Sequence, residues 1–463
     1  MTFSMDSDNT EGTIPSSEPK GTTMQIPSAT SSVTAPENAA IYAALADTFR
    51  SYGQEADAVE AELASIALGQ RNALMLYNLG TSYLMTQRPA LAVKWLRLAL
   101  EIDPTLVPAH QNLASILELD GSRIEAKYHR DEAYRRQCMF IDDASTCTRT
   151  VLILCTASTG NVPFDFLLPQ SRNRRITWMM EYASIEQVAH FPPYDLVFNA
   201  IGDQDVTDAS HDTVMRFLEL CDKPVINPPK SIARTSRDLI PDLLKDIDDV
   251  LAPPMVRLKP DAIRYTDAGQ LASAGVHLPM VARPVGSHGG RGMRLIETPA
   301  ALMSMDTGDV EELYASTYCD YRSVDGHYRK YRVIFIDRQP YPYHLAISEH
   351  WQVHYTSADM LSHQWKRDEE HRFLESPDIV LGEDAMRALR IIGQRIDLDF
   401  FGIDFSIMHD GRILIFEANA TMLVHTENYH DVLKFKNPYV QQILDAFDAF
   451  LVHRVSVANA LST

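Results

Sequence analysis

The sequence predicts a helical repeat region followed by a mixed α/β region, and three observations lead to this prediction. Small and large apolar residues recur every 34 residues between positions 38 and 139. Short apolar runs alternate with polar loops from about residue 149 onward. Late in the chain, two apolar runs joined by Asp410-Gly411 carry Asp404 and Glu417. A chain of 463 residues has room for two or three domains.

Composition and charge narrow the function classes. A net charge of −20 argues against a nucleic-acid surface, for which a basic patch would be expected. No apolar stretch approaches the length of a membrane span, and the N-terminus lacks the basic start and apolar core of a signal peptide. Five scattered cysteines form no close CxxC pair, so neither a disulfide framework nor a zinc site is indicated. We expect a cytoplasmic protein that binds neither nucleic acid nor membrane.

Residues 1–35 differ from the rest of the chain. They are rich in Ser, Thr, Pro and Gly and contain almost no aromatic residues. Such a segment cannot bury enough apolar surface to offset the entropy lost on ordering. We therefore expect a disordered tail.

The repeat region spans residues 38–139. Its recurring positions, each given for the three copies in turn, are Leu45/Leu79/Leu113, Ala46/Gly80/Ala114, Phe49/Tyr83/Leu117 and Ala58/Ala92/Ala126. This period and pattern resemble the tetratricopeptide repeat, in which small residues let two helices pack closely and large ones fill the space between them. The resemblance implies three helix pairs and a groove for a protein or peptide partner, or for a second subunit. A plain helical bundle is the alternative.

The α/β region divides into two parts. In the first, residues 149–228, the runs TVLILCT and YDLVFNAIGD are typical of buried strands, and TVMRFLELCDK is typical of a helix. The second part, residues 229–455, begins with a helical stretch at 236–247, continues through several strand-like runs and ends with a helix near 437–453.

The pair Asp410-Gly411 is a strong signal for a β-hairpin, because a two-residue type I′ turn needs positive φ at both central residues. With these two residues as the loop, 409 pairs with 412, and counting outward pairs Asp404 with Glu417. Side chains alternate along a strand, so Asn419 shares the face of Glu417. Three oxygen-bearing side chains should therefore converge.

Like charges directly opposite each other in a sheet are destabilising. We therefore expect the metal-free protein to hold an uncompensated repulsion between Asp404 and Glu417. A hard cation would explain the arrangement, because Mg²⁺ is usually held by one or two carboxylates together with the phosphates of a nucleotide. The alternatives are a carboxylate that points into water or a shifted register. The magnesium interpretation requires a phosphate-binding segment elsewhere in the chain.

The segment PMVARPVGSHGGRGMRLIE is the candidate for phosphate binding. Its two strand-like runs, 279–283 and 293–297, flank a loop with four glycines: Gly286, Gly289, Gly290 and Gly292. Glycines permit positive φ and close backbone approach, so successive amides can surround phosphate oxygens. The loop is neither a P-loop nor a Rossmann motif, and by itself it is more typical of a flexible turn.

Together, the glycine loop and the set Asp404, Glu417 and Asn419 resemble the ATP-grasp superfamily, in the branch of glutathione synthetase, D-alanine–D-alanine ligase and the ribosomal-protein glutamate ligases. Members of that family cover ATP with a strand–glycine loop–strand lid and bind Mg²⁺ with a late Asp followed by Glu-x-Asn. The sequence FEANA stands where the family has Glu-x-Asn. The resemblance covers about residues 150–455 and implies an α/β (α+β) ATP-grasp fold, ATP and Mg²⁺ as cofactors, and these three residues as metal ligands.

The resemblance also implies roles for other residues. Arg237 lies where the family usually has a lysine that reaches the phosphates, and Arg283 replaces the common lysine before the glycine loop. Both arginines keep the positive charge but replace the ammonium group of lysine with a planar guanidinium group. Arg332 resembles the family's arginine near the transferred phosphate and is the candidate catalytic residue; a surface arginine at a strand end is the alternative. The other nucleotide-binding candidates are Ser287, in the glycine loop, and the hinge residues Thr317, Tyr318 and Cys319.

Residues 342–367 are dense in histidine and aromatic residues. His350 and His354 have the spacing of a helical metal pair, but an HExxH motif is absent. A structural role or contact with substrate therefore competes with zinc binding, and the role of His363 stays open as well. We place the acceptor pocket in this segment and in residues 420–428.

The resemblance implies a ligase that joins a carboxylic acid to an amine, each a small molecule or a peptide, and releases ADP and phosphate. The carboxylate would attack the γ-phosphate of ATP, and the amine would then displace phosphate from the acyl phosphate. Two other interpretations stay open. One is a phosphotransferase on the same fold, and the other is a repeat-bearing scaffold with a vestigial ATP site.

Overall fold

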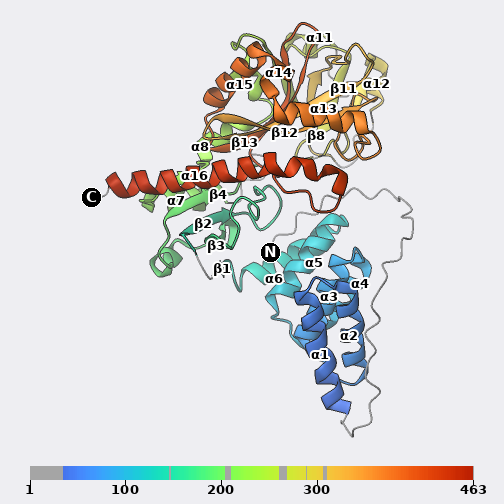
Figure 1. Ribbon diagram of the computed structural model, residues 1–463, viewed down its shortest axis with the longest axis vertical. Coiled ribbons are helices and arrows are strands. Elements are labelled where there is room, and N and C mark those ends of the chain that lie inside the picture. The colour runs from blue at the N-terminus through green and yellow to red at the C-terminus, as the bar shows by residue number, and fades with distance from the viewer. Residues whose placement is uncertain are drawn as a thin grey trace. The chain divides into compact units, whose positions relative to one another are not determined.

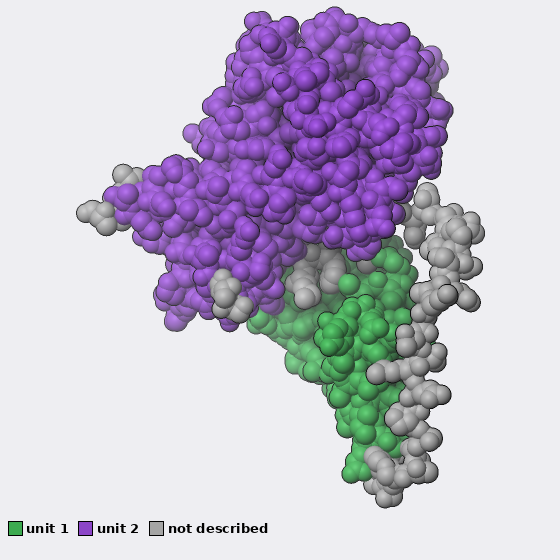
Figure 2. All heavy atoms as spheres, viewed as in Figure 1, with its two compact units in different colours: residues 1–138 green, residues 139–463 purple. Residues whose placement is uncertain are grey.

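The computed structural model describes residues 35–144, 147–203, 210–259, 268–287, 289–305 and 310–461. Residues 1–34 of the expected disordered tail lie outside these ranges. The chain divides into two compact units, residues 1–138 and residues 139–463 (Figure 2). Within the described ranges, no helix combines the length and the apolar character needed to cross a membrane.

The described part of unit 1 folds into three consecutive helix pairs (Figure 1). They are α1 (Ala35–Ser51) with α2 (Glu55–Ala67), α3 (Ala73–Met85) with α4 (Pro89–Ile102), and α5 (Val107–Leu119) with α6 (Arg123–Tyr134). The 34-residue period therefore corresponds to helical repeats that resemble tetratricopeptide repeats.

Burial explains why small residues recur in these helices. Ala58, Ala92 and Ala126 are all fully buried, and a Cβ added to Gly80 would lie 2.8 Å from Cγ of Leu96 on the paired helix. Small side chains are thus what lets each pair pack closely. One recurring position departs from the pattern: Leu45 is 42% exposed, while its equivalents in the other two copies are buried. Leu45 lies on α1, the terminal helix of the described stack.

Unit 2 begins with a five-stranded sheet of order β1-β3-β2-β4-β5. Its strands are β1 (Met139–Asp142), β2 (Arg149–Cys155), β3 (Asn173–Met179), β4 (Leu196–Asn199) and β5 (Val225–Ile226); α7 (His211–Leu220) and the 3₁₀ segments η1 (Met180–Tyr182) and η2 (Ile185–His190) lie between them. The runs TVLILCT and YDLVFNAIGD form β2 and β4, which are parallel. Strand β1 runs antiparallel to β3 and was not expected from the sequence.

A short connection leads to a four-stranded antiparallel sheet of order β7-β10-β8-β9. The connection consists of α8 (Pro229–Ile232), η4 (Ala233–Thr235) and α9 (Ile240–Leu244). The strands of the sheet are β7 (Met255–Leu258), β8 (Met280–Pro284), β9 (Arg294–Ile296) and β10 (Leu313–Thr317). Two short helices, α11 (Ala268–Ser273) and α12 (Pro299–Met303), lie between these strands in the sequence. The helix expected over 236–247 is shorter, because Pro241 lies in the first turn of α9, and proline is tolerated only there. The glycine loop connects β8 to β9.

The third sheet has the order β12-β11-β13-β14-β6. Its strands are β6 (Val250–Leu251), β11 (Tyr328–Ile336), β12 (Gln339–Ser348), β13 (Phe400–Ile407) and β14 (Ile413–Asn419); the helices of this part are α13 (Gln364–Glu375), α14 (Pro377–Leu381) and α15 (Glu383–Ile396). Alternate residues such as Phe335 and Phe401, whose rings stack 4.4 Å apart, form a core with α13 and α15. The opposite face of the same strands carries Arg332 and Asp404.

The last elements are η5 (Asp431–Lys436) and α16 (Asn437–Leu461), and α16 contacts both the first and the third sheet. Helix α16, red in Figure 1, runs between them. Its Phe447 ring lies 5.9 Å from that of Phe198 on β4 and 5.7 Å from that of Phe400 on β13. The helix expected near 437–453 therefore forms and continues for a further two turns.

Asn227 fixes the first sheet to the third more directly. This residue is fully buried and has a φ of 54°. Its side chain donates to the carbonyl of Phe400 (2.7 Å) and accepts from the amides of Asp399 and Phe400 (3.1 and 2.9 Å), while its own amide donates to the Asp399 carboxylate (2.9 Å). The end of β5 is thereby held against the start of β13, whose other residues carry the candidate site.

Candidate functional site

The hairpin of β13 and β14 pairs Asp404 with Glu417, as the sequence predicted. The expected two-residue turn is wrong, however. The Met408 amide donates to the Arg412 carbonyl (2.8 Å) and the Gly411 amide donates to the Met408 carbonyl (2.9 Å), which defines a three-residue loop. Gly411 has the positive φ, 86°, that such a loop needs at its last position.

A β-bulge restores the predicted pairing at the site. The inner pairs are shifted by one residue, so Phe405 lies opposite Ile415. The register then changes between Asp404 and Phe405, which leaves Phe416 as the extra residue and brings Glu417 opposite Asp404. The two deviations from a regular hairpin cancel, and the carboxylates share one face of the sheet.

Four strands contribute to a polar row across this face. Reading from β12 to β14, the directly opposed residues are His344, Arg332, Asp404 and Glu417. The row lies on the face opposite the helices α13 and α15, since the neighbouring residues Tyr331, Val333, Ile403 and Phe405 are in the apolar core. Arg332 is therefore an inward-facing member of the site and not a surface arginine at a strand end.

Asp404 is almost completely buried and fully paired with cations. The Arg332 guanidinium donates to both of its oxygens, at 2.6 and 2.9 Å, and Lys330 Nζ lies 3.1 Å from Oδ2. Burial by itself raises the pKa of Asp404, but the charges of Arg332 and Lys330 outweigh it and the net shift is downward. Asp404 is thus held as a carboxylate.

Glu417 is paired with two arginines from distant parts of the sequence. Arg237 Nη2 lies 2.8 Å from Oε2, and Arg283 Nη1 lies 3.5 Å from the same oxygen. Burial raises the pKa of Glu417, but the two guanidinium charges lower it to about 2. The expected uncompensated repulsion between Asp404 and Glu417 is therefore wrong, because each carboxylate has its own pair of cations.

The two arginines retain unused hydrogen-bonding capacity. Nε of Arg237 and Nε of Arg283 are both buried without a hydrogen-bond partner among the described residues. Burial lowers the pKa of Arg237, but the charge of Glu417 reverses the shift, and it is raised overall. For Arg283, burial and the neighbouring charge of Arg237 prevail and lower the pKa. Buried donors without partners are the feature that a polyanion would satisfy.

The first sheet also reaches this site. A Cβ added to Gly202 would lie 2.8 Å from Cγ2 of Thr421, two residues beyond the end of β14. The adjacent Asp203 is buried, and its negative charge contributes to the raised pKa of Arg237. Asp203 was not identified as a site residue from the sequence, although it is the last residue of the run YDLVFNAIGD.

The glycine loop is described except for residue 288. All four predicted glycines have positive φ, between 63° and 73°, so their identity is needed for the backbone conformation. Arg283 Nη2 donates to the carbonyl of Ser287 within the loop, and Gln352 Nε2 donates to the carbonyl of Gly290 (2.9 Å). Arg283 therefore connects the loop to Glu417.

The predicted hinge residues lie at the end of β10. The Thr317 hydroxyl accepts from the His277 amide (2.9 Å), and the Tyr318 amide donates to the Pro279 carbonyl (2.8 Å). The Tyr318 ring packs against Trp351, with 5.8 Å between centroids. Cys319 is half-buried, and burial raises the pKa of its thiol. These contacts engage the Tyr318 amide within the protein, and the adenine-binding role of the segment stays a prediction.

Asn419 completes the predicted set of oxygen ligands, and its Oδ1 accepts from the amide and the hydroxyl of Thr421, both at 2.7 Å. Among the described residues, no group of three or more His, Cys, Asp or Glu side chains is arranged to hold a metal ion. Asp404 and Glu417 could bind Mg²⁺ only together with amide or phosphate oxygens.

The two segments predicted to form the acceptor pocket do meet. Tyr343 occupies a bulge in β12, and its hydroxyl lies 3.0 Å from Nδ1 of His425. The neighbouring His344 is buried, and its Nε2 has no hydrogen-bond partner in the described structure. Burial and the charges of Arg332, Lys436 and Lys330 keep the pKa of His344 well below its ordinary value, so this imidazole is neutral.

The three histidines singled out by sequence lie apart from the polar row. His350 is exposed, His354 bonds to Thr356 (2.8 Å) beside the glycine loop, and His363 precedes α13 with Nε2 3.2 Å from Asp359. Lys330 and Tyr343 were missed. Lys330 could have been found from alternation, since it lies two residues before Arg332 on the same strand.

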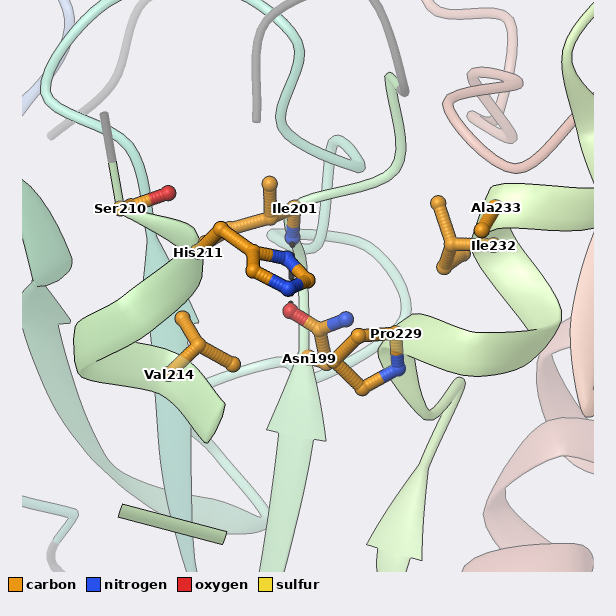
Figure 3. Close-up of a pocket in the computed structure, with 8 residues that line it drawn as sticks. All are labelled: Asn199, Ile201, Ser210, His211, Val214, Pro229, Ile232 and Ala233. Atoms are coloured by element: carbon orange, nitrogen blue, oxygen red, sulfur yellow. Dashed lines mark hydrogen bonds between the residues drawn. The ribbon is translucent and has the colours of Figure 1, made fainter. Parts of the chain in front are cut away.

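A separate hollow of about 370 Å³, its open mouth included, lies at the end of β4 between α7 and α8 (Figure 3). The His211 ring points over the amide of Asn199 in the centre of the hollow. Both ends of that amide are engaged within the fold, with the Asn227 carbonyl (2.9 Å) and the Ile201 amide (3.3 Å). The other lining groups include Val214, Ile232 and Ala233, and the hollow contains none of the predicted site residues.

Comparison with known proteins finds solved structures that are similar to part of the chain. No family profile matches the sequence, and no curated protein matches it. Among solved structures, the chain is similar to the second TPR of Spaghetti (RPAP3) bound to an HSP90 peptide (23% identity, 21% of this chain and 91% of that one, TM-score 0.21). It is also similar to MamA (20% identity, 22% of this chain and 60% of that one, TM-score 0.21). A third similar structure is the first TPR of Spaghetti bound to the same peptide (14% identity, 22% of this chain and 83% of that one, TM-score 0.21). The repeat assignment itself rests on the three helix pairs described above.

Proposed function

We propose that unit 2 is an ATP- and Mg²⁺-dependent ligase that joins a carboxylic acid to an amine through an acyl phosphate. The observation that supports this best is the convergence of Arg237, Arg283, Lys330 and Arg332 on two opposed carboxylates, with a glycine loop tied to one of these arginines. The sequence resemblance to ATP-grasp enzymes leads to the same proposal.

The residues fit a nucleoside triphosphate with its metal ion. The unpartnered Nε atoms of Arg237 and Arg283 supply donors for phosphate oxygens, and the glycine loop would cover the phosphates. Asp404, Glu417 and Asn419 would hold Mg²⁺, which when bound neutralises charge on the transferring phosphoryl group. Thr317, Tyr318 and Cys319 are proposed to flank the adenine.

The chemistry then consists of two displacements. A carboxylate oxygen of the acid forms a bond to the γ-phosphorus, and the bond to the β-phosphate oxygen breaks and releases ADP. The amine nitrogen then bonds to the acyl carbon, phosphate leaves, and the nitrogen loses a proton. Arg332 would stabilise negative charge on the transferred group, while the chain would otherwise position the reactants and exclude water.

The acid and the amine are proposed to bind near Tyr343, His344 and His425, where the two predicted acceptor segments meet. Unit 1 is proposed to bind a protein or peptide partner, or a second copy of the chain, through its helical repeats. A phosphotransferase remains the second candidate, because the same phosphate-binding groups would serve it; it would need no amine.

Product analysis separates these functions. The protein is incubated with Mg·ATP and pooled acids and amines, and the products are identified by mass spectrometry. A ligase yields ADP only when both an acid and an amine are present, with a product whose mass equals acid plus amine minus water. A phosphorylated product without amine would instead establish the phosphotransferase, and the absence of ADP with every pool would count against both.

A further inference from the structure

The arrangement of charges at Glu417 bears on the order in which nucleotide and metal bind. Four cationic side chains, Arg237, Arg283, Lys330 and Arg332, contact two carboxylates. Their formal charges, four positive and two negative, leave +2, and the buried Asp203 near Arg237 reduces this to +1. A free divalent cation would therefore approach a site whose net charge repels it.

Three of the four carboxylate oxygens already contact cationic groups. Both arginine contacts of Glu417 are made to Oε2, and three donor contacts from Arg332 and Lys330 reach the two oxygens of Asp404. A carboxylate has about four lone-pair sites, so Asp404 has little capacity left. A cation entering alone would have to displace guanidinium groups from these carboxylates.

A polyphosphate removes this obstacle, because it brings acceptors for the same guanidinium groups. Arg237 and Arg283 each have a buried Nε without a hydrogen-bond partner in the described chain, so they can gain bonds to phosphate before giving up Glu417. Arg283 is also bonded to Ser287 of the glycine loop, which places a second phosphate-binding element at the same guanidinium.

We propose that Arg237 and Arg283 close the cation site in the nucleotide-free protein, so that the triphosphate binds first, without metal, and frees Glu417 for the cation. This inference rests on the proposed function. It makes Arg237 a positioning residue that acts on the metal through Glu417. It also requires nucleotide and metal to strengthen each other's binding beyond their association in solution.

The test uses Mn²⁺ as the metal probe and a fluorescent ATP analogue as the nucleotide, with the full-length protein. Bound Mn²⁺ is measured by the loss of the EPR signal of the free aqueous ion. We expect the wild type to bind the nucleotide in EDTA with an affinity within about tenfold of that in Mg²⁺, and to bind no Mn²⁺ without nucleotide at about 0.1 mM metal. Arg237→Met, which removes the closer guanidinium, should strengthen Mn²⁺ binding by the nucleotide-free protein at least about tenfold.

Two further variants identify the cause. Adding Glu417→Gln to Arg237→Met should abolish the gained Mn²⁺ binding. Arg234→Met, which removes a nearby arginine bonded only to the Arg395 carbonyl (2.6 Å) as far as the described contacts show, should leave Mn²⁺ binding at the wild-type level.

The inference alone is overturned if nucleotide binds only with metal, or if the nucleotide-free wild type binds Mn²⁺ at about 0.1 mM metal. The wild-type measurements suffice for this decision even if a variant fails to fold. Absence of nucleotide binding under every condition, Mg²⁺ included, would overturn the proposed function and this inference with it.

Discussion

At the scale of single residues, the site is defined by which cation holds which carboxylate. Counting outward from Asp410-Gly411 placed Asp404 opposite Glu417, but this pairing holds only because the longer turn and the bulge at Phe416 cancel. The partners of Glu417 could not be read in the same way. Arg237 is 180 positions away in the sequence, and a contact over that distance depends on how the connection after the first sheet is docked on the third.

The ion pairs change the expected effect of Glu417→Gln on stability. Had the carboxylates repelled each other, the variant would be as stable as the wild type or more so. Because Glu417 instead holds two buried guanidinium groups, we predict that the variant lowers the free energy of unfolding by about 2 kcal/mol. Denaturant unfolding measures this.

The matched control is Glu369→Gln. Its side chain is 18% exposed, as is that of Glu417, and it is bonded to one arginine, Arg329, outside the polar row. Glu369→Gln should lower the free energy of unfolding by about as much as Glu417→Gln does. A Glu417→Gln protein more stable than the wild type would show that these ion pairs do not form in solution.

A second residue-scale feature lies in unit 1, where His110 and His129 face each other with 2.8 Å between their Nδ1 atoms. Only one proton fits between them. Burial, followed by the charge of His110, lowers the pKa of His129, and Glu125 partly opposes this; Arg97 and Glu132 are the other charges that act on it. The folded state thus resists protonation of His129.

The sign of the pH dependence follows. His129 titrates below the ordinary value of 6.5 when folded, so the unfolded chain binds the proton more readily and stability is lost as the pH falls through and below about 6.5. We predict that the free energy of opening in α5 and α6, obtained from hydrogen-exchange rates divided by the intrinsic rate at each pH, falls between about pH 7.5 and pH 5.5. His129→Gln should weaken this dependence, while the same change at the exposed His453 should leave it intact. Equal pH dependence in all three proteins would contradict the assignment.

At the scale of elements, regular patterns were predictable and their interruptions were not. Strands β2, β4, β8 and β9 were predicted from short apolar runs. The helix pairs were predicted from the 34-residue repeat and its resemblance to the tetratricopeptide repeat. The hairpin of β13 and β14 shows the limit: its longer turn and its bulge at Phe416 are each one-residue shifts that cancel. Nothing local to Asp410-Gly411 distinguishes a two-residue from a three-residue loop, since both favour glycine at positive φ.

Asn227 is the element-scale contact on which the site most depends, because it joins the end of β5 to the start of β13. We predict that Asn227→Ala lowers the free energy of unfolding by about 4 kcal/mol. The change leaves buried backbone groups of Asp399 and Phe400 without their hydrogen-bond partner, and it places alanine at a φ of 54°. Asn112→Ala, which removes one half-buried bond to Thr81, is the control and should cost about 1 kcal/mol. Equal losses in the two variants would contradict the role of Asn227 as a clamp.

At the scale of the whole molecule, the chain separates into a helical repeat unit and a unit with three sheets. All residues of the candidate site lie in unit 2, between residues 203 and 425. The sequence predicted a change from repeats to α/β structure, but not the extra strand β1 at the start of unit 2, because Met139–Asp142 is too short to show a strand pattern.

This division predicts that nucleotide binding belongs to unit 2 alone. A protein comprising residues 139–463 should bind the ATP analogue with an affinity within about threefold of the full chain. Circular dichroism and a cooperative melt serve as controls for folding. A folded truncation that no longer binds nucleotide would show that unit 1 contributes to the site.

The most direct measurement of the proposed chemistry compares ADP formation by the wild type, Glu417→Gln and Glu369→Gln, at a temperature well below the melting range of all three and with the acid and amine that support turnover. The two variants are expected to lose similar stability, so any difference in rate reports chemistry rather than folding. We predict that Glu417→Gln lowers the rate at least about a hundredfold, since charge stabilisation of the transferring phosphoryl group is lost, while Glu369→Gln keeps near-normal turnover. Near-normal turnover by a folded Glu417→Gln protein would contradict the assignment of this carboxylate, and with it the proposed site.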